Sequence, residues 1–362
     1  MVTYFQVSVT PATGFLARNN GTMKKAFLLL ALLAADSQAS HQRVPSHVLD
    51  SLLTAGIDQT LRQNYASAES TFRAVARDFP DHPAGFLYQA ALLQTTAMDY
   101  ELAMERGPFD SLLALGQERA SAMIDRNPDS PWGYFYRGTM LGYDSYARAM
   151  RGDWFGAASK GMSSASDFHR AVATDSSFYD AYAGIGTYSY WKTRKMEFIA
   201  WLPFVGDKRE EGIQHLIVCI EHGAYNRFAA MSSLVSIYLD DENNESAARL
   251  ALEALRSYPA NRLFLWGLAT ALDRSGDTSG ALGAYQRLLA SMISDPKENT
   301  YNELVCRLNM IKLAVPTRTT VETKSDLEGL FALKSRKFPE HLRKRAESKF
   351  REAELLRGAL TE

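Results

Sequence analysis

The chain has 362 residues, of which 46% are apolar, and a formal net charge of −1 at pH 7. That apolar content is ordinary for a globular protein with a sizeable core. The near-zero charge excludes a surface built as a whole for nucleic acid or an anionic membrane. The two cysteines, Cys219 and Cys306, form no Cys-x-x-Cys pair, so no zinc ribbon or thioredoxin-type site is encoded. Cys219 is expected to be a small buried apolar residue, and whether it pairs with Cys306 depends on the fold.

The N-terminal region resembles an export signal preceded by additional residues. A basic start at Met23 is followed by the apolar run 26–35, and Ser37 and Ala39 occupy the two positions that signal peptidase reads. The apolar run is shorter than the roughly 20 residues that span a bilayer. We therefore predict a signal peptide at 23–39, cleavage after Ala39, and export to the periplasm or cell surface of a Gram-negative-type bacterium. Residues 1–22 are interpreted as an over-extended N-terminus, with a buried N-terminal helix as the alternative.

An internal repeat follows from residues that recur at a fixed distance. From residue 46 onward the apolar pattern is helical, and Pro and Gly fall between the helices. A spacing of 34 residues is the period of the tetratricopeptide repeat (TPR), a pair of antiparallel helices A and B. The small residues Ala247 and Ala281 are expected where helix B crosses helix A closely, and Pro259 ends a helix B. Five pairs of positions have this spacing: Leu234 and Leu268, Tyr238 and Leu272, Ala247 and Ala281, Ala251 and Tyr285, Ala254 and Leu288.

A further unit lies near the start of the mature chain, where Gly56, Ala68, Phe72 and Pro80 fall at TPR spacings. The chain thus resembles the TPR family over three fairly regular units. The resemblance implies an all-α fold, a TPR-like α-solenoid of antiparallel helix pairs over residues 46–298. Residues 299–362 are expected to form C-terminal helices and a cap.

Between the regular units the apolar spacing predicts longer helices, at 84–103, 109–126, 132–150, 154–174, 178–195 and 208–221. Gly107-Pro108 is expected to break the chain between the first two of these, and Gly223 to end the last one in a left-handed cap. Beyond residue 298 we expect a helix at 299–313, an exposed loop at 317–325 and a final helix at 340–356. The final helix has one apolar and one basic face, as the terminal helix of a solenoid requires.

The stretch from Asp175 to Leu216 is the densest in aromatic rings and contains an uncharged insertion from Phe198 to Gly206. Segments 175–186 and 201–212 resemble uncharacterised bacterial TPR proteins and, more distantly, the eukaryotic Iml2 and tetratricopeptide-39 group, over residues 52–289 in all. That group is linked to lipid handling and inclusion clearance. The resemblance transfers no catalytic residues, and the export signal departs from the group, so its cellular role is not carried over.

No catalytic or metal-binding constellation is recognisable. The seven histidines form no His-Glu-x-x-His motif, and His215 with Cys219 four residues later would need two further ligands. Walker A, Gly-x-Ser-x-Gly and Gly-x-Gly-x-x-Gly motifs are absent. At Asp207 and Glu210 an N-cap with a capping box is favoured over a paired-carboxylate acid–base site. We therefore predict no enzyme, no catalytic residue, no metal and no cofactor.

The aromatic stretch is the best candidate for a binding surface, because TPR arrays bind partners in a concave groove lined by helices A, and Tyr, Trp and Arg anchor interfaces. The leading hypothesis is a non-enzymatic scaffold of the bacterial cell envelope that binds a protein or peptide. The alternative is a carrier of an apolar small molecule or lipid at residues 178–206, and a third interpretation is that the rings only fill space between long helices. No nucleic acid partner and no transmembrane span are expected. The candidate residues are Tyr188, Trp191, Lys192, Arg194, Trp201, Phe204 and Arg209.

Overall fold

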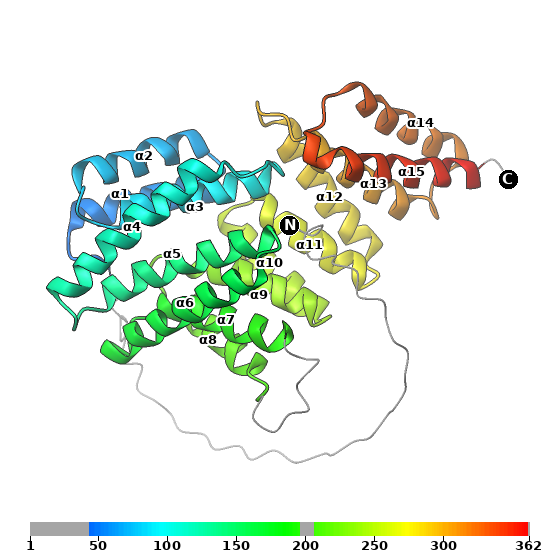
Figure 1. Ribbon diagram of the computed structural model, residues 1–362. Helices are drawn as coiled ribbons and strands as arrows, with labels where there is room; N and C mark the ends of the chain where they lie inside the picture. Colours follow the sequence, from blue (N-terminus) through cyan, green and yellow to red (C-terminus); the bar gives the residue numbers. More distant parts are fainter. Residues whose placement is uncertain (1–42, 196–205, 361–362) are drawn as a thin grey trace, which may run out of the picture.

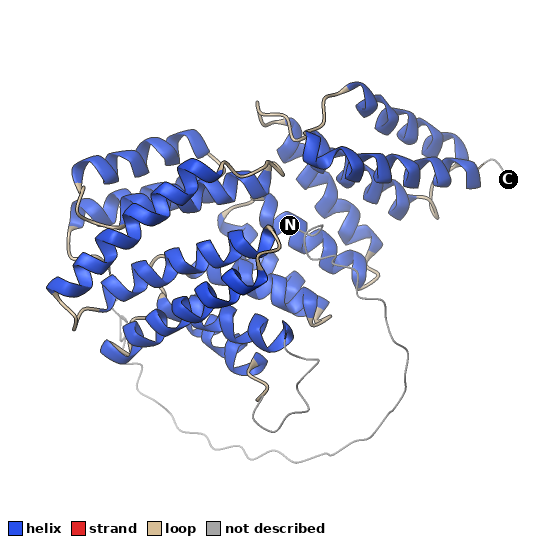
Figure 2. Ribbon diagram, in the orientation of Figure 1, coloured by secondary structure: helices blue, strands red, loops and turns tan. Residues whose placement is uncertain are grey.

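The computed structural model describes residues 43–195 and 206–360, and these ranges contain helices and no β-strand (Figure 2). The predicted signal peptide and the candidate residues Trp201 and Phe204 lie outside the described residues. Short 3₁₀ turns at Ala332–Ser335 and Glu340–Leu342 precede the last helix. The α-helices are α1 (His47–Leu61), α2 (Tyr65–Asp78), α3 (Ala84–Asp99), α4 (Arg106–Arg126), α5 (Pro131–Met150), α6 (Trp154–Thr174), α7 (Ala181–Lys195), α8 (Arg209–His222), α9 (Arg227–Asp240), α10 (Asn244–Ser257), α11 (Arg262–Arg274), α12 (Thr278–Ile293), α13 (Thr300–Ala314), α14 (Thr320–Phe331) and α15 (Arg343–Ala359).

Consecutive helices pack as hairpins, from α1–α2 to α11–α12, and the hairpins follow one another in a curved stack (Figure 1). The first helix of each hairpin is its helix A and the second is its helix B. Helices A of neighbouring hairpins also contact each other, in the series α3, α5, α7, α9 and α11. Such stacking of one hairpin on the next is an α-solenoid, which confirms the predicted fold class.

Short polar turns begin the B helices of the regular units. The side chains of Asn64, Asn243 and Asp277 each accept a hydrogen bond from the backbone N–H three residues on, at 3.4, 3.2 and 2.9 Å. Each cap satisfies a donor that the first turn of a helix leaves unpaired. Asn243 and Asp277 are 34 residues apart, so the repeat period also sets where each of these B helices begins.

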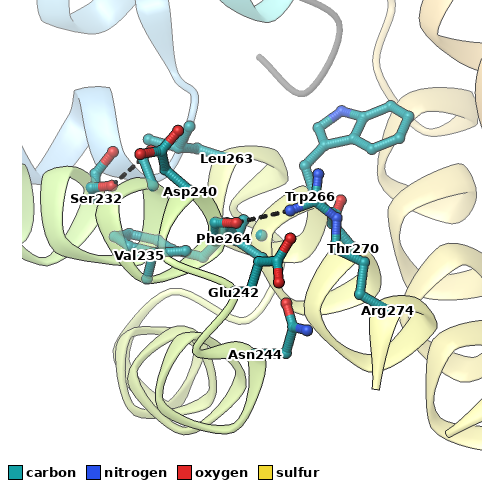
Figure 3. A pocket seen from close by; sticks show the side chains of 13 residues that line it. Ser232, Val235, Asp240, Glu242, Asn244, Leu263, Phe264, Trp266, Thr270 and Arg274 are labelled. Carbon is teal, nitrogen blue, oxygen red and sulfur yellow. Dashed lines mark hydrogen bonds between the residues drawn. The ribbon is translucent and has the colours of Figure 1, made fainter. Parts of the chain in front are cut away.

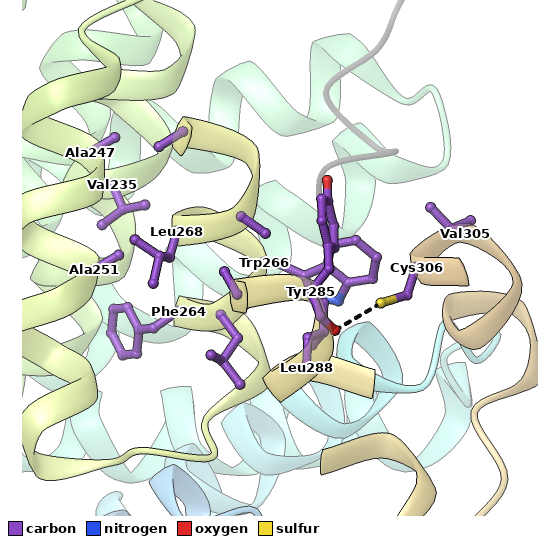
Figure 4. Close-up of a cluster of buried hydrophobic side chains, with 14 of the residues drawn as sticks. Val235, Ala247, Ala251, Phe264, Trp266, Leu268, Tyr285, Leu288, Val305 and Cys306 are labelled. Carbon is purple, nitrogen blue, oxygen red and sulfur yellow. Dashed lines mark hydrogen bonds between the residues drawn. The ribbon is translucent and has the colours of Figure 1, made fainter. Parts of the chain in front are cut away.

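The residues at TPR positions lie in the contacts between helices. A Cβ atom on Gly56 would lie 2.3 Å from the Phe72 ring, so the absence of a side chain there lets α1 and α2 pack closely. Figure 4 shows Ala247 and Ala251 of α10 facing the core that α11 shares. Six of the TPR positions are buried: Ala68, Phe72, Ala247, Ala251, Ala281 and Tyr285.

Two prolines occupy equivalent turns between repeats. Pro80 follows α2 and Pro259 follows α10. Their carbonyl oxygens accept hydrogen bonds from Arg119 of α4 and Arg287 of α12, at 3.2 and 3.0 Å. In both places the B helix of the next hairpin therefore holds the turn that precedes it.

Helices α7 and α8 cross at two glycines. A Cβ atom on Gly186 would lie 2.5 Å from the carbonyl oxygen of Gly212. Because backbone cannot move aside as a flexible side chain can, we expect Gly186→Ala to lower the free energy of unfolding by about 1–3 kcal/mol. The matched control is Gly283→Ala, at a helical position with open space, which should raise it by up to about 1 kcal/mol. Urea unfolding measures both changes, and equal stabilities would contradict a tight crossing.

Helix α14 shows that the predicted exposed loop at 317–325 is wrong. The Thr319 hydroxyl accepts the Glu322 N–H at 3.3 Å, and the Glu322 carboxylate accepts the Thr319 N–H at 2.9 Å. This capping box begins a helix within a polar stretch. Further along the same helix, Leu327 and Leu330 are fully buried. The polar first turn therefore conceals an amphipathic helix.

Other helix ends also differ from the prediction. Gly107-Pro108 breaks no helix, because α4 begins at Arg106 and both residues lie in its first turn, where proline is tolerated since the N–H groups have no helical acceptor. Helix α3 ends at Asp99 rather than at 103. Gly223 ends α8 with φ −66°, in the extended rather than the left-handed region.

Helices α7 and α8 both begin later than predicted. Helix α7 starts at Ala181 rather than at 178, and the carboxylate of Asp180 accepts backbone N–H groups at the start of α9. The predicted capping box of Asp207 and Glu210 is wrong: α8 begins at Arg209 after an N-cap residue without a side-chain bond. Asp207 instead accepts hydrogen bonds from the backbone N–H and the guanidinium of Arg209, at 2.9 and 3.0 Å.

The solenoid closes on itself, because its first hairpins contact its last helices. Arg262, at the start of α11, has a side chain only 2% exposed and lies between Asp99 of α3 and Asp295 after α12. Its Nε is 2.8 Å from Asp99 and its Nη1 is 2.9 Å from Asp295. Asn261 donates to the carbonyl oxygen of Leu61 at 2.7 Å. In Figure 1 the cyan end of α3 accordingly reaches the yellow and orange helices.

Candidate functional site

A groove of about 660 Å³ lies between α9 and α11, the helices A of the two most regular repeats (Figure 3). Gly267 permits the close approach of these helices, since a Cβ atom there would lie 2.7 Å from Val235. Val235, Leu239, Phe264 and Trp266 supply most of its apolar lining. The groove therefore combines a packed apolar floor with the polar side chains of the next turns.

The groove-lining residues repeat with the TPR period. Residues four apart share one face of a helix, and equivalent positions of stacked repeats line one concave surface. The 34-residue spacing is therefore the sequence signal for this groove, and aromatic density, which favours α7, misses it. Three pairs of lining residues have this spacing, one member on each helix: Ser232 and Trp266, Ser236 and Thr270, Asp240 and Arg274.

Charged side chains stand around the groove. Arg274 of α11 donates to the carbonyl oxygen of Leu239 at 2.7 Å, where the C-terminal end of α9 favours a positive charge. Asp240 accepts from Nε of Arg194 at 2.7 Å. Glu242 is exposed, adopts φ 56° and makes no ion pair within residues 43–195 and 206–360. The groove thus offers one paired carboxylate, one unpaired carboxylate and one arginine.

Arg194 connects the aromatic helix α7 to this groove. The Tyr190 hydroxyl donates to the same Asp240 oxygen, at 2.8 Å. Burial and this hydrogen bond raise the pKa of Tyr190, so the hydroxyl remains protonated and continues to act as a donor. Of the predicted binding residues that the structure describes, Arg194 contacts a lining side chain, whereas Tyr188, Trp191, Lys192 and Arg209 do not line the groove.

The described rings of α7 pack between helices. The Tyr188 ring is half-buried and lies 3.4 Å from the place of a Cβ atom on Gly161 of α6. Trp191 meets the Tyr190 ring edge-on at a centroid distance of 5.2 Å. Lys192 is exposed, with Nζ 5.7 Å from the centre of the Tyr188 ring. These residues serve helix contacts, which is the space-filling interpretation of the aromatic stretch.

Arg209 lies in the first turn of α8 and pairs with Asp207 at 2.6 Å. Hydrogen bonds from its guanidinium and its backbone lower the pKa of Asp207. The pair therefore stays charged at neutral pH and fixes the start of α8.

A second cavity, of about 510 Å³, lies beside the turns that precede α3 and α5. His82 lines it and packs edge-on against Tyr136 at a centroid distance of 5.2 Å. Burial, with a smaller contribution from Arg126, lowers the pKa of His82 to about 4. The imidazole is therefore neutral at pH 7 and its Nδ1 accepts the backbone N–H of Ala84 at 3.2 Å.

Both thiols are free and buried. Burial raises the pKa of Cys219 and raises that of Cys306 to about 12, so neither is a thiolate at neutral pH. Cys306 donates to the carbonyl oxygen of Tyr285 at 3.3 Å (Figure 4). In the part of the chain that the structure describes, no three His, Cys, Asp or Glu side chains are grouped to hold a metal ion. No described helix combines the length and apolarity needed to cross a bilayer.

Known structures share this architecture. The Cut9–Hcn1 hetero-tetramer of the APC/C has a TM-score of 0.53 at 11% identity, over 87% of this chain and 51% of that chain. The C-terminal part of a TPR repeat-containing protein from Cytophaga hutchinsonii has a TM-score of 0.44 at 15% identity, over 83% of this chain and 98% of that chain. A thermophilic TPR protein of Thermus thermophilus has a TM-score of 0.40 at 14% identity, over 62% and 98% respectively. At such identities the likeness concerns the fold alone.

The repeat pattern is recognised in the sequence as well. Residues 233–298 match the tetratricopeptide repeat family, and this segment contains α10, α11 and α12 together with most of α9. No curated protein matches the chain. The groove between α9 and α11 is therefore built by TPR units, and the chain as a whole has the fold of a TPR solenoid.

Proposed function

We propose that this protein is a non-enzymatic scaffold that binds a segment of a partner protein in the groove between α9 and α11. A TPR scaffold suggests a protein-interaction role in general. The observation that carries the specific proposal is the groove itself, which lies on the helices A of the two repeats that match the family. Stacked repeats use such concave surfaces for extended ligands.

The lining indicates what the bound segment would offer. Phe264 and Trp266 suit an apolar side chain, and a volume of about 660 Å³ is in the range of small-ligand sites rather than of a docked domain. The Oδ1 atom of Asn244, also in the lining, is buried without a hydrogen-bond partner among the described residues. Glu242 adds a carboxylate without an ion pair there. Both would accept from peptide N–H groups or from a basic side chain that follows the apolar one.

The alternative function, a carrier of an apolar molecule at residues 178–206, has less support. Neither the groove nor the second cavity is lined by α7, and the described rings of α7 pack between helices. We retain export as part of the proposal on the signal-like sequence at 23–39. The partner would then be a protein of the cell envelope.

The test blocks the groove without disturbing the repeat. Ser236→Trp places a ring among the lining residues, and Ser279→Trp places the same ring on an exposed position of α12. The wild type is purified from the envelope of its own cell, and its co-purified proteins are converted into an array of overlapping peptides. We expect Ser236→Trp to weaken binding to the positive peptides at least about ten-fold, a loss of roughly 1.4 kcal/mol, with Ser279→Trp unchanged.

Equal binding by both variants, or no peptide above background, would remove the groove from the proposal. The intact mass of the purified chain tests export in the same preparation. A mass that begins at Ser40 is expected, and an uncleaved chain in the cytoplasm would contradict it.

A further inference from the structure

Four large apolar side chains are exposed together where α5 turns into α6. Trp154 is 61% exposed and Phe155 is 94% exposed, with Met162 two turns further along α6 and Met150 at the end of α5. These four residues are named the apolar tip. Single exposed apolar residues are ordinary, but adjacent ones that include Trp and Phe mark a contact surface.

The exposed face of α6 beside the apolar tip carries no charge. From Trp154 to Ser166 its exposed residues are only Trp, Phe, Ala, Ser and Met. Lys160, within the same stretch, is half-buried and pairs with Asp144 of α5 at 3.4 Å. The outward face of a surface helix normally carries charged residues. This face is therefore suited to a surrounding that is partly free of water.

Cations without carboxylate partners border the apolar tip. Arg151, in the turn before α6, is exposed and makes no ion pair within the described ranges. Lys192 and Lys195, in the last turn of α7, are exposed and likewise make none there. Lys192 contacts the ring of Tyr188. Three positive charges are thus free to meet anionic groups.

The packing of α6 on α7 places these cations at the same end of the helix stack as the apolar tip. A Cβ atom on Gly184 would meet the ring of Phe168, and one on Gly161 would lie 3.4 Å from Tyr188. Later residues of α7 therefore meet earlier residues of α6, so the two helices are antiparallel. The end of α7 and the beginning of α6 lie on one side of the molecule.

The nearby carboxylates do not cancel these charges. Asp153 accepts the N–H of Gly156 and pairs with Arg148, both at 2.9 Å. Asp207, at the start of α8, is held by Arg209. Each of these carboxylates already has its own cation, so Arg151 and the two lysines remain as a local positive excess.

We propose that the apolar tip docks on a bilayer surface that contains anionic lipids. Trp154 and Phe155 would enter the headgroup region, while Arg151, Lys192 and Lys195 would contact lipid phosphates. Aromatic rings with one wet edge favour this boundary, and basic residues beside them are attracted to anionic lipids. Attachment of this kind is peripheral and uses a surface separate from the groove between α9 and α11.

A lipid surface is favoured over a protein partner by the charge pattern. The cations form a border around apolar side chains, and the uncharged face of α6 offers serine hydroxyls rather than a set of directional charged groups. This matches the layering of a bilayer, with phosphates outside and acyl chains inside. The near-neutral net charge of the chain does not oppose it, because the excess is local.

The experiment measures sedimentation of the chain from Ser40 onward with vesicles, which keeps every described residue and removes the apolar run 26–35. Vesicles of phosphatidylcholine alone are compared with vesicles that also contain phosphatidylglycerol. We expect binding to the second kind and weak binding to the first, with a decrease as salt is raised. The double variant Trp154→Ser/Phe155→Ser should lose at least about ten-fold in partitioning, and Arg151→Glu should lose about five-fold or more.

Two controls separate the apolar tip from general stickiness and from misfolding. Val321→Ser/Leu355→Ser removes side chains of comparable exposure, 76% and 77%, on α14 and α15, and should bind as the wild type does. Phe155→Cys carries an environment-sensitive dye, which the buried native thiols leave as the single accessible label. Its emission should shift to the blue on phosphatidylglycerol vesicles, whereas a dye at Leu355→Cys should not respond.

The proposal fails if the wild type ignores both kinds of vesicle, if the two double variants lose binding equally, or if the dye at residue 155 does not shift. A protein that crosslinks through residue 155 in the absence of vesicle binding would also overturn it, in favour of a protein contact. Ser236→Trp should bind vesicles normally, so failure of the groove leaves this result unaffected.

Discussion

Replacing Arg262 with alanine should lower the free energy of unfolding by about 3–5 kcal/mol, because it leaves buried carboxylates without their cation. Asp99 and Asp295, its two partners, have side chains only 10% and 12% exposed. The cluster joins residues 163 positions apart, so its loss should also release the last hairpins from the first. Urea unfolding followed by circular dichroism measures the change.

The matched control for this prediction is Arg249→Ala. Arg249 pairs with Glu245 at 3.7 Å on α10, and both side chains are largely exposed. Such a surface pair contributes about 0.5 kcal/mol or less. A loss at Arg262 no larger than the loss at Arg249 would show that the closure of the solenoid does not depend on this cluster.

Acid should reduce the difference between the wild type and Arg262→Ala. Burial would raise the pKa of Asp295, but hydrogen bonds from Tyr100 and from the Lys297 backbone, with the Arg262 charge, together lower it below its usual range. A depressed pKa in the folded state stabilises the protein above the unfolded value, near pH 4, and this stabilisation is lost as pH falls through the folded pKa. Unfolding measured from pH 7 to pH 3 should show the two proteins converging.

Replacing Asp180 with alanine should cost at least about 3 kcal/mol, since it strands several buried backbone donors. Asp180 is 3% exposed, and its carboxylate accepts the N–H groups of Ala224, Tyr225 and Asn226 at 3.2, 3.0 and 2.7 Å. These donors lie just before the first residue of α9, where the helix dipole favours a negative charge. Hydrogen exchange should be accelerated at these three amides, and urea unfolding gives the total loss.

Asp153→Ala is the control for this second prediction. Asp153 caps α6 through one N–H, that of Gly156, and is exposed, so its loss should cost about 1 kcal/mol. Asp180→Asn keeps one acceptor oxygen and should fall between the two alanine variants. An Asp180→Ala protein as stable as Asp153→Ala would mean that water replaces the carboxylate at the start of α9.

The sequence determined the solenoid because the repeat is local and periodic. Ala247 and Ala281 had to be small where helices cross, and Asn243 and Asp277 had to cap, within each hairpin and at the same spacing. Those requirements involve neighbours in the chain, so they leave a pattern of period 34 that can be read directly. The same locality led to the wrong prediction for α14, whose first turn is polar because Thr319 caps it.

The groove was available in the sequence in principle, because its polar positions obey the repeat period. Ser236 and Thr270, like Asp240 and Arg274, are 34 residues apart. Composition pointed elsewhere, to the aromatic helix α7, whose described rings fill contacts with α6 and α9. Composition cannot distinguish a ring that packs from a ring that binds, since both are apolar and both recur at helical spacing.

Only the tertiary structure decided how the ends of the solenoid meet and which surfaces remain open. Arg262 and Asp99 carry no mark of their pairing, because helical periodicity reports that a face is buried and not which distant element covers it. The same holds for Trp154 and Phe155, which look like core residues in the sequence and are exposed in the fold. The curvature that accumulates over successive hairpins sets both outcomes, and it depends on all the helix crossings together rather than on any single segment.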